Sequence, residues 1–238
     1  EIGIGPGSNL KHYQQNKVEK IIGVDPSTEL NKIAIKRAEK YNLDIEFLVE
    51  SADNLSVPDN SIDTVVSTYA LCSIPNPSMT LKEIYRVLKP TGTCWINLGD
   101  TYNTISGGIR GLERAKKTGA TRSISKKNIM GQGFQQQKST EVPNKCLLLI
   151  PHRFAIGCID RGWIVRNDIV WAKRNAMPES CTDRFSKKHE YFFFMVKSEK
   201  YYFDLDAIRD KHAQIDSRGY KRIKYEGKGN PNNFSGDV

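Results

Sequence analysis

Short apolar runs and amphipathic helical stretches alternate along the first hundred residues. Residues 28–41 and 78–88 carry apolar side chains at the spacing of one helix face. The expected inner face of the first stretch consists of Leu30, Ile33, Ala34, Arg37, Ala38 and Tyr41. The runs with the character of buried strands are residues 1–4, 20–25, 45–49, 62–67 and 93–98, the last entered through a turn at 90–92. This alternation predicts an α/β protein with a doubly wound, mostly parallel sheet.

The pattern changes after residue 102. Residues 103–142 are rich in Gly, Ser, Thr, Gln, Lys and Arg and have few apolar anchors, which predicts a long, basic, flexible surface insertion. The elements expected after it are a helix over 145–161, strands over 163–171, 191–196 and 201–203, a polar loop over 174–189, and a helical turn or two over 206–212. Residues 213–238 predict a flexible tail.

The composition of the 238 residues is that of a globular protein, with 38% hydrophobic and 26% charged residues. No apolar run approaches the roughly 18–20 residues of a membrane-spanning helix, so we expect no membrane partner. The five cysteines are scattered and form no C-x-x-C pair, which disfavours both a disulfide framework and a zinc ribbon. A reducing, cytoplasmic compartment is expected.

The charge is unevenly divided between the two parts of the chain. Residues 1–100 hold 10 basic and 13 acidic residues, which leaves 26 of the 36 basic and 14 of the 27 acidic residues for the rest. An excess of this size in one part favours a polyanionic partner, and nucleic acid is the usual one. The alternative is a solvated basic surface.

A glycine turn follows the first apolar run. Gly3, Gly5 and Gly7 form a G-x-G-x-G pattern, and Asp25 ends the next strand about twenty residues later. Glycines let a ligand lie against the backbone, and a carboxylate at this place accepts hydrogen bonds from both hydroxyls of a ribose. Ser8 breaks the dinucleotide fingerprint, which disfavours NAD. The alternative is a tight turn with a surface aspartate.

Residues 1–93 resemble class I S-adenosylmethionine-dependent methyltransferases of the small-molecule type, which have a Rossmann-like fold. The matching segments are E-I-G-I-G-P-G at 1–7, V-D-P-S at 24–27, S-A-D-N-L-S-V-P-D-N-S-I-D at 51–63, L-C-S-I at 71–74 and E-I-Y-R-V-L-K-P-T-G-T at 83–93. The resemblance implies S-adenosylmethionine as cofactor. It places the glycines near the methionine part, the strand-end acid on the ribose and the 52–54 loop beside adenine. The implied cofactor-binding residues are Glu1, Gly3, Gly5, Gly7, Asp25, Pro26, Ala52, Asp53 and Asn54.

Residues 81–212 resemble a narrower group, the site-specific DNA amino-methyltransferases of bacterial and phage restriction-modification systems. The segments are R-V-L-K-P-T-G-T-C-W-I-N-L-G-D-T-Y at 86–102, L-L-L-I-P-H-R-F-A at 147–155, G-W-I-V-R-N-D-I-V-W-A-K-R-N-A-M-P-E-S at 162–180, D-R-F-S-K-K-H-E-Y-F-F-F at 183–194 and Y-Y-F-D-L-D-A-I-R at 201–209. The resemblance implies methyl transfer to cytosine-N4 or adenine-N6 in DNA, in agreement with the charge distribution.

The chain departs from that group at the catalytic tetrapeptide, which is Ser, Asp or Asn followed by Pro-Pro-Tyr or Pro-Pro-Phe. No Pro-Pro pair occurs in this chain, and the matching place reads Ser67-Thr68-Tyr69-Ala70. The residues implied for catalysis are Ser67, Thr68 and Tyr69. The cofactor half also comes first and belongs to another subfamily. A permuted enzyme, a fusion, a chimera and a fragment beginning at Glu1 all agree with this order.

Base methylation requires the target base to leave the duplex, and hence a stacking surface and phosphate contacts. Trp171, at the end of an apolar strand, is the candidate for stacking, with a core position as the alternative. The full candidate set for nucleic-acid binding is Trp171, Lys173, Arg174, Asn175, Arg184, Lys187 and Lys188. The insertion adds a basic arm that comprises Arg110, Arg114, Lys116, Lys117, Arg122, Lys126 and Lys127.

No metal site is expected, because neither His152 nor His189 has a second ligand at useful spacing. Asp100, after the fifth strand, is expected either to line the acceptor pocket or to cap a turn. The predicted division is a cofactor-binding half at 1–102, the insertion at 103–142, the remaining sheet with a DNA-contacting loop at 143–212, and the tail. The predicted function is methylation of an exocyclic amino group in DNA. A small-molecule methyltransferase and an inactive DNA-binding remnant remain as alternatives.

Overall fold

The computed structural model describes residues 1–103, 142–176 and 179–208. The predicted insertion at 103–142, with its seven basic residues, lies almost wholly outside the described residues, and so does the tail at 213–238. Residues Glu1–Tyr202 form one compact unit. The described part of the second unit, 203–208, contains the short 3-10 helix η2 (Asp206–Ile208).

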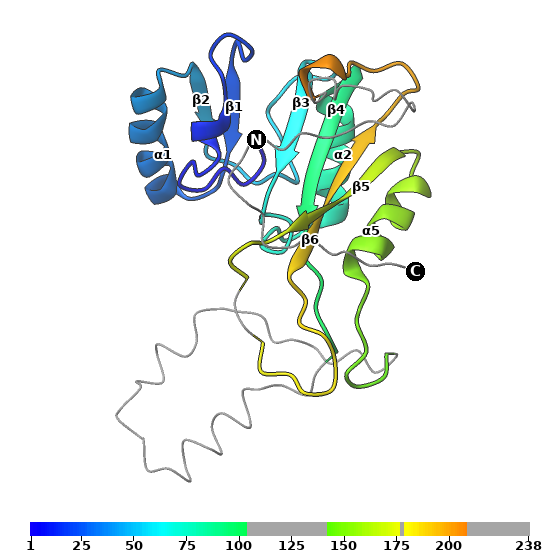
Figure 1. Cartoon of the computed structure of the whole chain (residues 1–238). Helices are drawn as coiled ribbons and strands as arrows, with labels where there is room; N and C mark the ends of the chain where they lie inside the picture. The colour runs from blue at the N-terminus through cyan, green and yellow to red at the C-terminus, as the bar shows by residue number, and fades with distance from the viewer. Residues whose placement is uncertain (104–141, 177–178, 209–238) are drawn as a thin grey trace, which may run out of the picture. The chain divides into compact units, whose positions relative to one another are not determined.

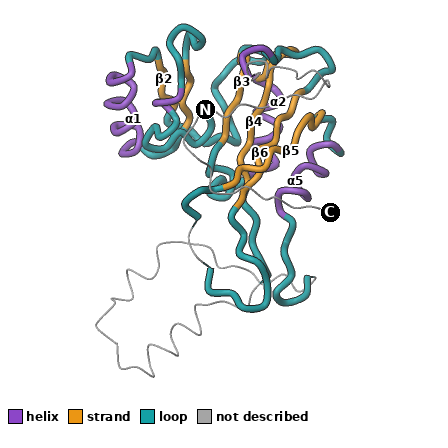
Figure 2. The backbone as a smooth tube through the Cα atoms, viewed as in Figure 1, coloured by secondary structure: helices purple, strands orange, loops and turns teal. Residues whose placement is uncertain are grey.

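Among its described residues, the first unit contains six strands and three α-helices (Figure 1). The strands are β1 (Ile21–Val24), β2 (Ile45–Leu48), β3 (Ile62–Ser67), β4 (Leu88–Leu98), β5 (Ile164–Ala172) and β6 (His189–Val196). The helices are η1 (Leu10–His12), α1 (Thr28–Tyr41), α2 (Pro77–Val87) and α5 (Ile150–Ile159). Figure 2 shows the three α-helices flanking the strands.

The strands are ordered β2-β1 and β3-β4-β6-β5, and a single residue connects the two groups. Ile2 forms parallel bridges both to Val24 in β1 and to Ser67 in β3. The β1–β2 and β3–β4 pairs are parallel, whereas β6 is antiparallel to both of its neighbours. The expected mixed α/β architecture with a mostly parallel sheet is therefore confirmed.

Helix α1 packs on the glycine turn through small residues. The Ser27 side chain accepts a hydrogen bond from the Leu30 N–H at its start, as expected of a capping serine. Ala34 is buried, and a Cβ added at Gly7 would lie 3.2 Å from the Ala34 Cβ. Ile33, expected on the inner face, is 45% exposed instead. The close approach to the turn needs alanines, so the larger side chain points outward.

Three expected elements differ from the structure. Strand β4 begins at Leu88 and includes the expected turn at 90–92, where its register against β3 shifts. Helix α5 begins at Ile150 rather than at residue 145, because Leu149 has left-handed backbone angles. Residues 201–203 form no strand. None of these positions belongs to a long periodic run, and sequence patterns are weakest outside such runs.

The main core lies between the sheet and helices α2 and α5. Ile84 of α2, Cys158 of α5, and Ile96, Phe193 and Met195 of the central strands are at most 2% exposed. At the carboxyl end of β4, Leu98 pairs with Tyr191, and Ala172 pairs with His189. The ends of β4 and β5 and the start of β6 therefore meet at one edge of the sheet (Figure 1).

Candidate active site

The three glycines of the turn all have left-handed backbone angles, but they face different surroundings. Their φ values are 68° for Gly3, 51° for Gly5 and 73° for Gly7. A Cβ at Gly3 would lie 2.3 Å from the Ala70 Cβ, and one at Gly7 would lie 2.6 Å from Leu10. A Cβ at Gly5 would meet nothing closer than 4.0 Å. Gly3 and Gly7 are therefore required for packing, whereas a Cβ at Gly5 would meet only ordinary van der Waals contacts.

Asp25 lies beside Gly5 and is 8% exposed. One carboxylate oxygen accepts the Gly5 N–H at 3.0 Å, and the other accepts the Ser27 N–H at 2.9 Å. Each oxygen has two lone pairs, so both can still accept a hydroxyl. The arrangement fits the ribose of a nucleoside cofactor, because it fixes a pair of acceptors beside the glycine turn.

A second hydrogen-bonded group joins the glycine turn to the end of β3. The Glu1 carboxylate accepts hydrogen bonds from the Asn9 side-chain amide and the Tyr13 hydroxyl, both at 2.8 Å. Asn9 also donates to the Thr68 hydroxyl at 2.9 Å. Burial and the Glu1 charge raise the pKa of Tyr13 above its ordinary value. Thr68 is thus held against the segment that follows the glycine turn.

The three residues implied for catalysis lie in different environments. Ser67 is 1% exposed, and its hydroxyl has no hydrogen-bond partner among the described residues. Thr68 is half-buried and bonded to Asn9. Tyr69 is 57% exposed and has a φ of 56°. Only Tyr69 projects from the sheet edge toward the second half of the chain.

Tyr69 meets the β5–β6 hairpin. Its ring lies 6.2 Å from the Trp171 ring in an edge-on arrangement. The Lys173 ammonium lies 5.6 Å from the Tyr69 ring and 5.5 Å from the Trp171 ring, and it is ion-paired with Glu190. Burial, and then the Glu190 charge, raise the pKa of Tyr69. Trp171 is 40% exposed and so does not occupy the alternative core position.

A polar cavity of about 300 Å³ opens next to this cluster, at the carboxyl end of β4. Its lining consists of Gly99, Asp100, Thr101, Tyr102, Lys173, Glu179, Arg184, Lys187, His189 and Glu190. Three ion pairs lie in its wall: Lys173–Glu190, Arg184–Glu179 at 2.5 Å and Lys187–Asp100 at 3.1 Å. The site is therefore walled by paired rather than free charges.

Asp100 links the cavity to the backbone on either side of it. It lines the cavity, and its Oδ1 accepts the backbone N–H groups of Thr101 and Ile150. Lys187, expected to contact phosphate, is instead largely buried against Asp100. Arg184 is paired with Glu179, and its guanidinium lies 3.9 Å from the Tyr102 ring centroid.

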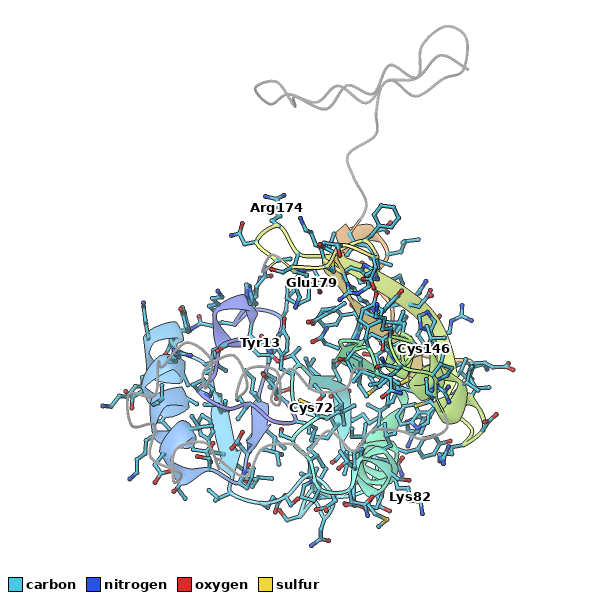
Figure 3. The ribbon with its side chains drawn as sticks, turned by 90° about the horizontal axis from the view of Figure 1, so that it is seen from below. Tyr13, Cys72, Lys82, Cys146, Arg174 and Glu179 are labelled. Atoms are coloured by element: carbon cyan, nitrogen blue, oxygen red, sulfur yellow. The ribbon has the colours of Figure 1, made fainter. Side chains whose placement is uncertain are left out.

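The other expected nucleic-acid contacts are exposed on the loop between β5 and β6. They are Arg174, Asn175 and Lys188. Within the described part of the chain, neither cation has an acidic partner. Figure 3 shows Arg174 pointing away from the body of the protein. These three, unlike Lys187 and Arg184, are available to phosphate.

The remaining residues predicted to bind the cofactor are spread over two loops. Pro26 and Asn54 are exposed, Asp53 is half-buried, and Ala52 belongs to the core. Two of the unexpected polar residues at the site hydrogen-bond to each other. They are Glu190 and Asn97, whose side-chain amide donates to the Glu190 Oε2 at 3.1 Å. A polar residue in each of two apolar strands was the available signal, because such residues are costly to bury without a partner.

Neither a metal-binding cluster nor a membrane-spanning helix is found in the described ranges. No group of three or more His, Cys, Asp or Glu side chains there has an arrangement that could hold a metal ion. None of the helices described has the length and apolar character that a bilayer crossing requires.

The sheet order, the glycine turn and the strand-end carboxylate define a class I S-adenosylmethionine-dependent methyltransferase. A family model described as DNA methylase matches residues 76–235, and one described as a methyltransferase domain matches residues 1–96. The chain belongs to the DNA methylase family.

Similar proteins agree with both matches. Type II methyltransferase M.SfiI of Streptomyces fimbriatus is 31% identical over 85% of this chain and 47% of its own length. Thiol S-methyltransferase TMT1A of Homo sapiens is 39% identical over 39% of this chain and 38% of its own. A SAM-dependent methyltransferase from Aquifex aeolicus shares the fold at a TM-score of 0.50 and 16% identity, over 82% of this chain and 79% of that one. The chain spans 39–47% of the length of four Type II relatives.

Proposed function

We propose that this chain transfers a methyl group from S-adenosylmethionine to an exocyclic amino group of a DNA base, cytosine-N4 or adenine-N6. The observation that carries the proposal is the meeting of Tyr69 with Trp171 and Lys173. Tyr69 follows β3, the strand to which Ile2 beside the glycine turn is bridged. Trp171 and Lys173 lie in the part of the chain that matches the DNA methylase family. Cofactor and acceptor are thereby brought to one edge of the sheet.

The cofactor would lie across the glycine turn. Asp25 would accept the ribose hydroxyls, Gly5 would leave room for the ligand, and the loop of Ala52, Asp53 and Asn54 would flank adenine. The cofactor supplies a methyl group on a positively charged sulfur. The protein's part is to align the acceptor nitrogen with that methyl group and to exclude water, because methyl transfer to an amine depends mainly on alignment and desolvation.

The base would leave the duplex and enter the edge beside Tyr69. Trp171 would offer a stacking face, which is worth about 1–3 kcal/mol per base. Arg174, Asn175 and Lys188, exposed on the adjoining loop, would contact phosphates, and the basic second part of the chain would add attraction at longer range. All five cysteines are free thiols, as a reducing cytoplasm would leave them.

Labelled methyl transfer tests this function. The purified chain is incubated with methyl-labelled cofactor and duplex DNA of mixed sequence, and the product nucleosides are identified after digestion. We expect label in N4-methylcytosine or N6-methyladenine, and loss of cofactor binding and transfer in Asp25→Ala. Glu46→Ala, which removes only an exposed carboxylate paired with Lys20, should behave as the parent. Intact cofactor binding with no label in DNA would refute the proposal.

Two alternatives are distinguished by the same experiment. The match of the first part to thiol S-methyltransferases supports transfer to a small molecule, and label found only in added thiols or amines would establish it. The absence of a Pro-Pro-Tyr element supports a DNA-binding protein without activity. Salt-dependent DNA binding with no transfer to any acceptor would establish that function.

A further inference from the structure

The missing Pro-Pro-Tyr element leaves open what holds the target amino group. We propose that the Glu190–Lys173 pair reads the target base. Glu190 accepts a hydrogen bond from the exocyclic amino group, and Lys173 donates one to the neighbouring ring nitrogen. The inference rests on the proposed function, because it assigns the acceptor contacts of that same site.

The position of Glu190 is fixed from several sides. It pairs with Trp171 in the β5–β6 ladder, and its side chain is 15% exposed in the wall of the cavity. Lys173 contacts its Oε1, and the Asn97 amide donates to its Oε2 at 3.1 Å. Gly99 lies beneath it, since a Cβ there would be 3.5 Å from the Oε1. Both oxygens keep a lone pair for a further donor.

The pair also stands next to the aromatic surface. Lys173 lies within 5.6 Å of both the Tyr69 and the Trp171 ring centroids. A base stacked on Trp171 would therefore present its edge to the ammonium and the carboxylate at once.

A carboxylate acceptor beside an ammonium donor can distinguish one base from another. Cytosine and adenine each carry an amino donor next to a ring-nitrogen acceptor, which is the complement of a carboxylate beside an ammonium. Thymine and guanine present a carbonyl next to a ring N–H. In the same orientation, the carboxylate would face a carbonyl oxygen and the ammonium would face an N–H, so neither hydrogen bond could form. Sites built on such contacts reject the wrong partner strongly, because buried polar groups would remain unpaired.

The carboxylate also serves the transfer step. The amino nitrogen forms a bond to the methyl carbon, and the bond from that carbon to sulfur breaks with its electron pair on sulfur. The nitrogen then carries a positive charge and an extra proton. That proton passes to the Glu190 carboxylate and from there to water, which leaves a neutral methylated amine and the thioether product.

Binding measurements test the reading of the base. The chain, saturated with the demethylated cofactor, is titrated with single-stranded dC, dA and dT oligonucleotides. We expect dC or dA to bind at least about tenfold more tightly than dT, and Glu190→Gln with Lys173→Gln to reduce that preference to within about threefold. Equal binding of all three by the parent, or a preference unchanged in the double variant, would overturn the inference.

Kinetics test the transfer step. Glu190→Gln should lower kcat for DNA methylation by at least about 100-fold and leave the cofactor Kd within about threefold. The double variant, which leaves no unpaired charge, should be equally slow. Recovery of kcat in the double variant would show a structural pair and overturn the inference, and Glu46→Gln is the matched control. Base preference without DNA methylation by the parent would refute only the proposed function.

Discussion

The Lys187 ammonium lies 3.1 Å from the Asp100 Oδ2, and the two side chains are 11% and 0% exposed. The other Asp100 oxygen accepts the N–H of Ile150, the first residue of α5. One buried carboxylate therefore connects the end of β4, the start of α5 and the loop that enters β6.

Removal of one member of this pair should destabilise the fold. Lys187→Met leaves a buried carboxylate without its cation, and such a loss typically costs about 3–5 kcal/mol. Urea unfolding followed by circular dichroism measures it. Lys145→Met, at an ion pair whose side chains are 72% and 53% exposed, is the control and should cost no more than about 1 kcal/mol. Equal losses in the two variants would contradict the prediction.

Alanine at two glycines of the turn should have different effects. At Gly5 the added methyl group would lie 4.0 Å from the Asp25 Oδ2, where the ribose is expected, so cofactor affinity should fall at least about tenfold while left-handed strain costs only about 1–2 kcal/mol. At Gly3 it would lie 2.3 Å from the Ala70 Cβ, so the melting temperature should fall further. Calorimetry and thermal melting separate the two. Parental cofactor affinity in Gly5→Ala would show that the ligand lies elsewhere.

Truncation of the exposed tryptophan should weaken DNA binding. Trp171→Ala removes the expected stacking face, worth about 1–3 kcal/mol, and the Kd for single-stranded DNA should rise accordingly. Fluorescence anisotropy at fixed salt measures it. Ile169→Ala, 43% exposed on the same strand, is the matched control and should bind as the parent does. The prediction fails if both variants bind alike.

Acid should act on the fold through Glu83. Hydrogen bonds from Arg86 lower the pKa of this carboxyl below its ordinary value of 4.5, with a further contribution from the Leu55 N–H. The free energy of stabilisation from the ionised Glu83 is therefore complete when the pH is above the ordinary pKa of the carboxyl. It is lost as the pH falls through the lower pKa of the folded state. Glu83→Gln should be less stable at pH 7 and should lose less on acidification. Parallel stability curves from pH 7 to pH 3 would contradict this.

Sequence patterns predicted the parts of the fold that depend on local chemistry. The serine cap of α1, the glycine turn and the carboxylate at the end of β1 all follow from residue type and spacing. The start of α5 did not, because the left-handed angle at Leu149 has no signature in a leucine. A helix boundary set by a single backbone angle is invisible to apolar periodicity.

The site was only partly predictable for a related reason. Tyr69, Trp171 and Lys173 were each named from the sequence, but their meeting depends on the pairing of strands far apart in the chain. Glu190 and Asn97 were missed because each reads as an isolated polar residue in an apolar strand. Their partnership exists only in the register of β4 against β6. Long-range register cannot be read from a single sequence.

Strand β6 lies between β4 and β5 in the sheet, yet it follows both of them in the chain. During synthesis, β4 and β5 leave the ribosome before the strand that separates them exists. The backbone edges of β4 and β5 that face β6 remain unpaired until residues 189–196 have been made. A ribosome that stalls between these segments would display an unfinished sheet, which is the kind of surface that chaperones bind.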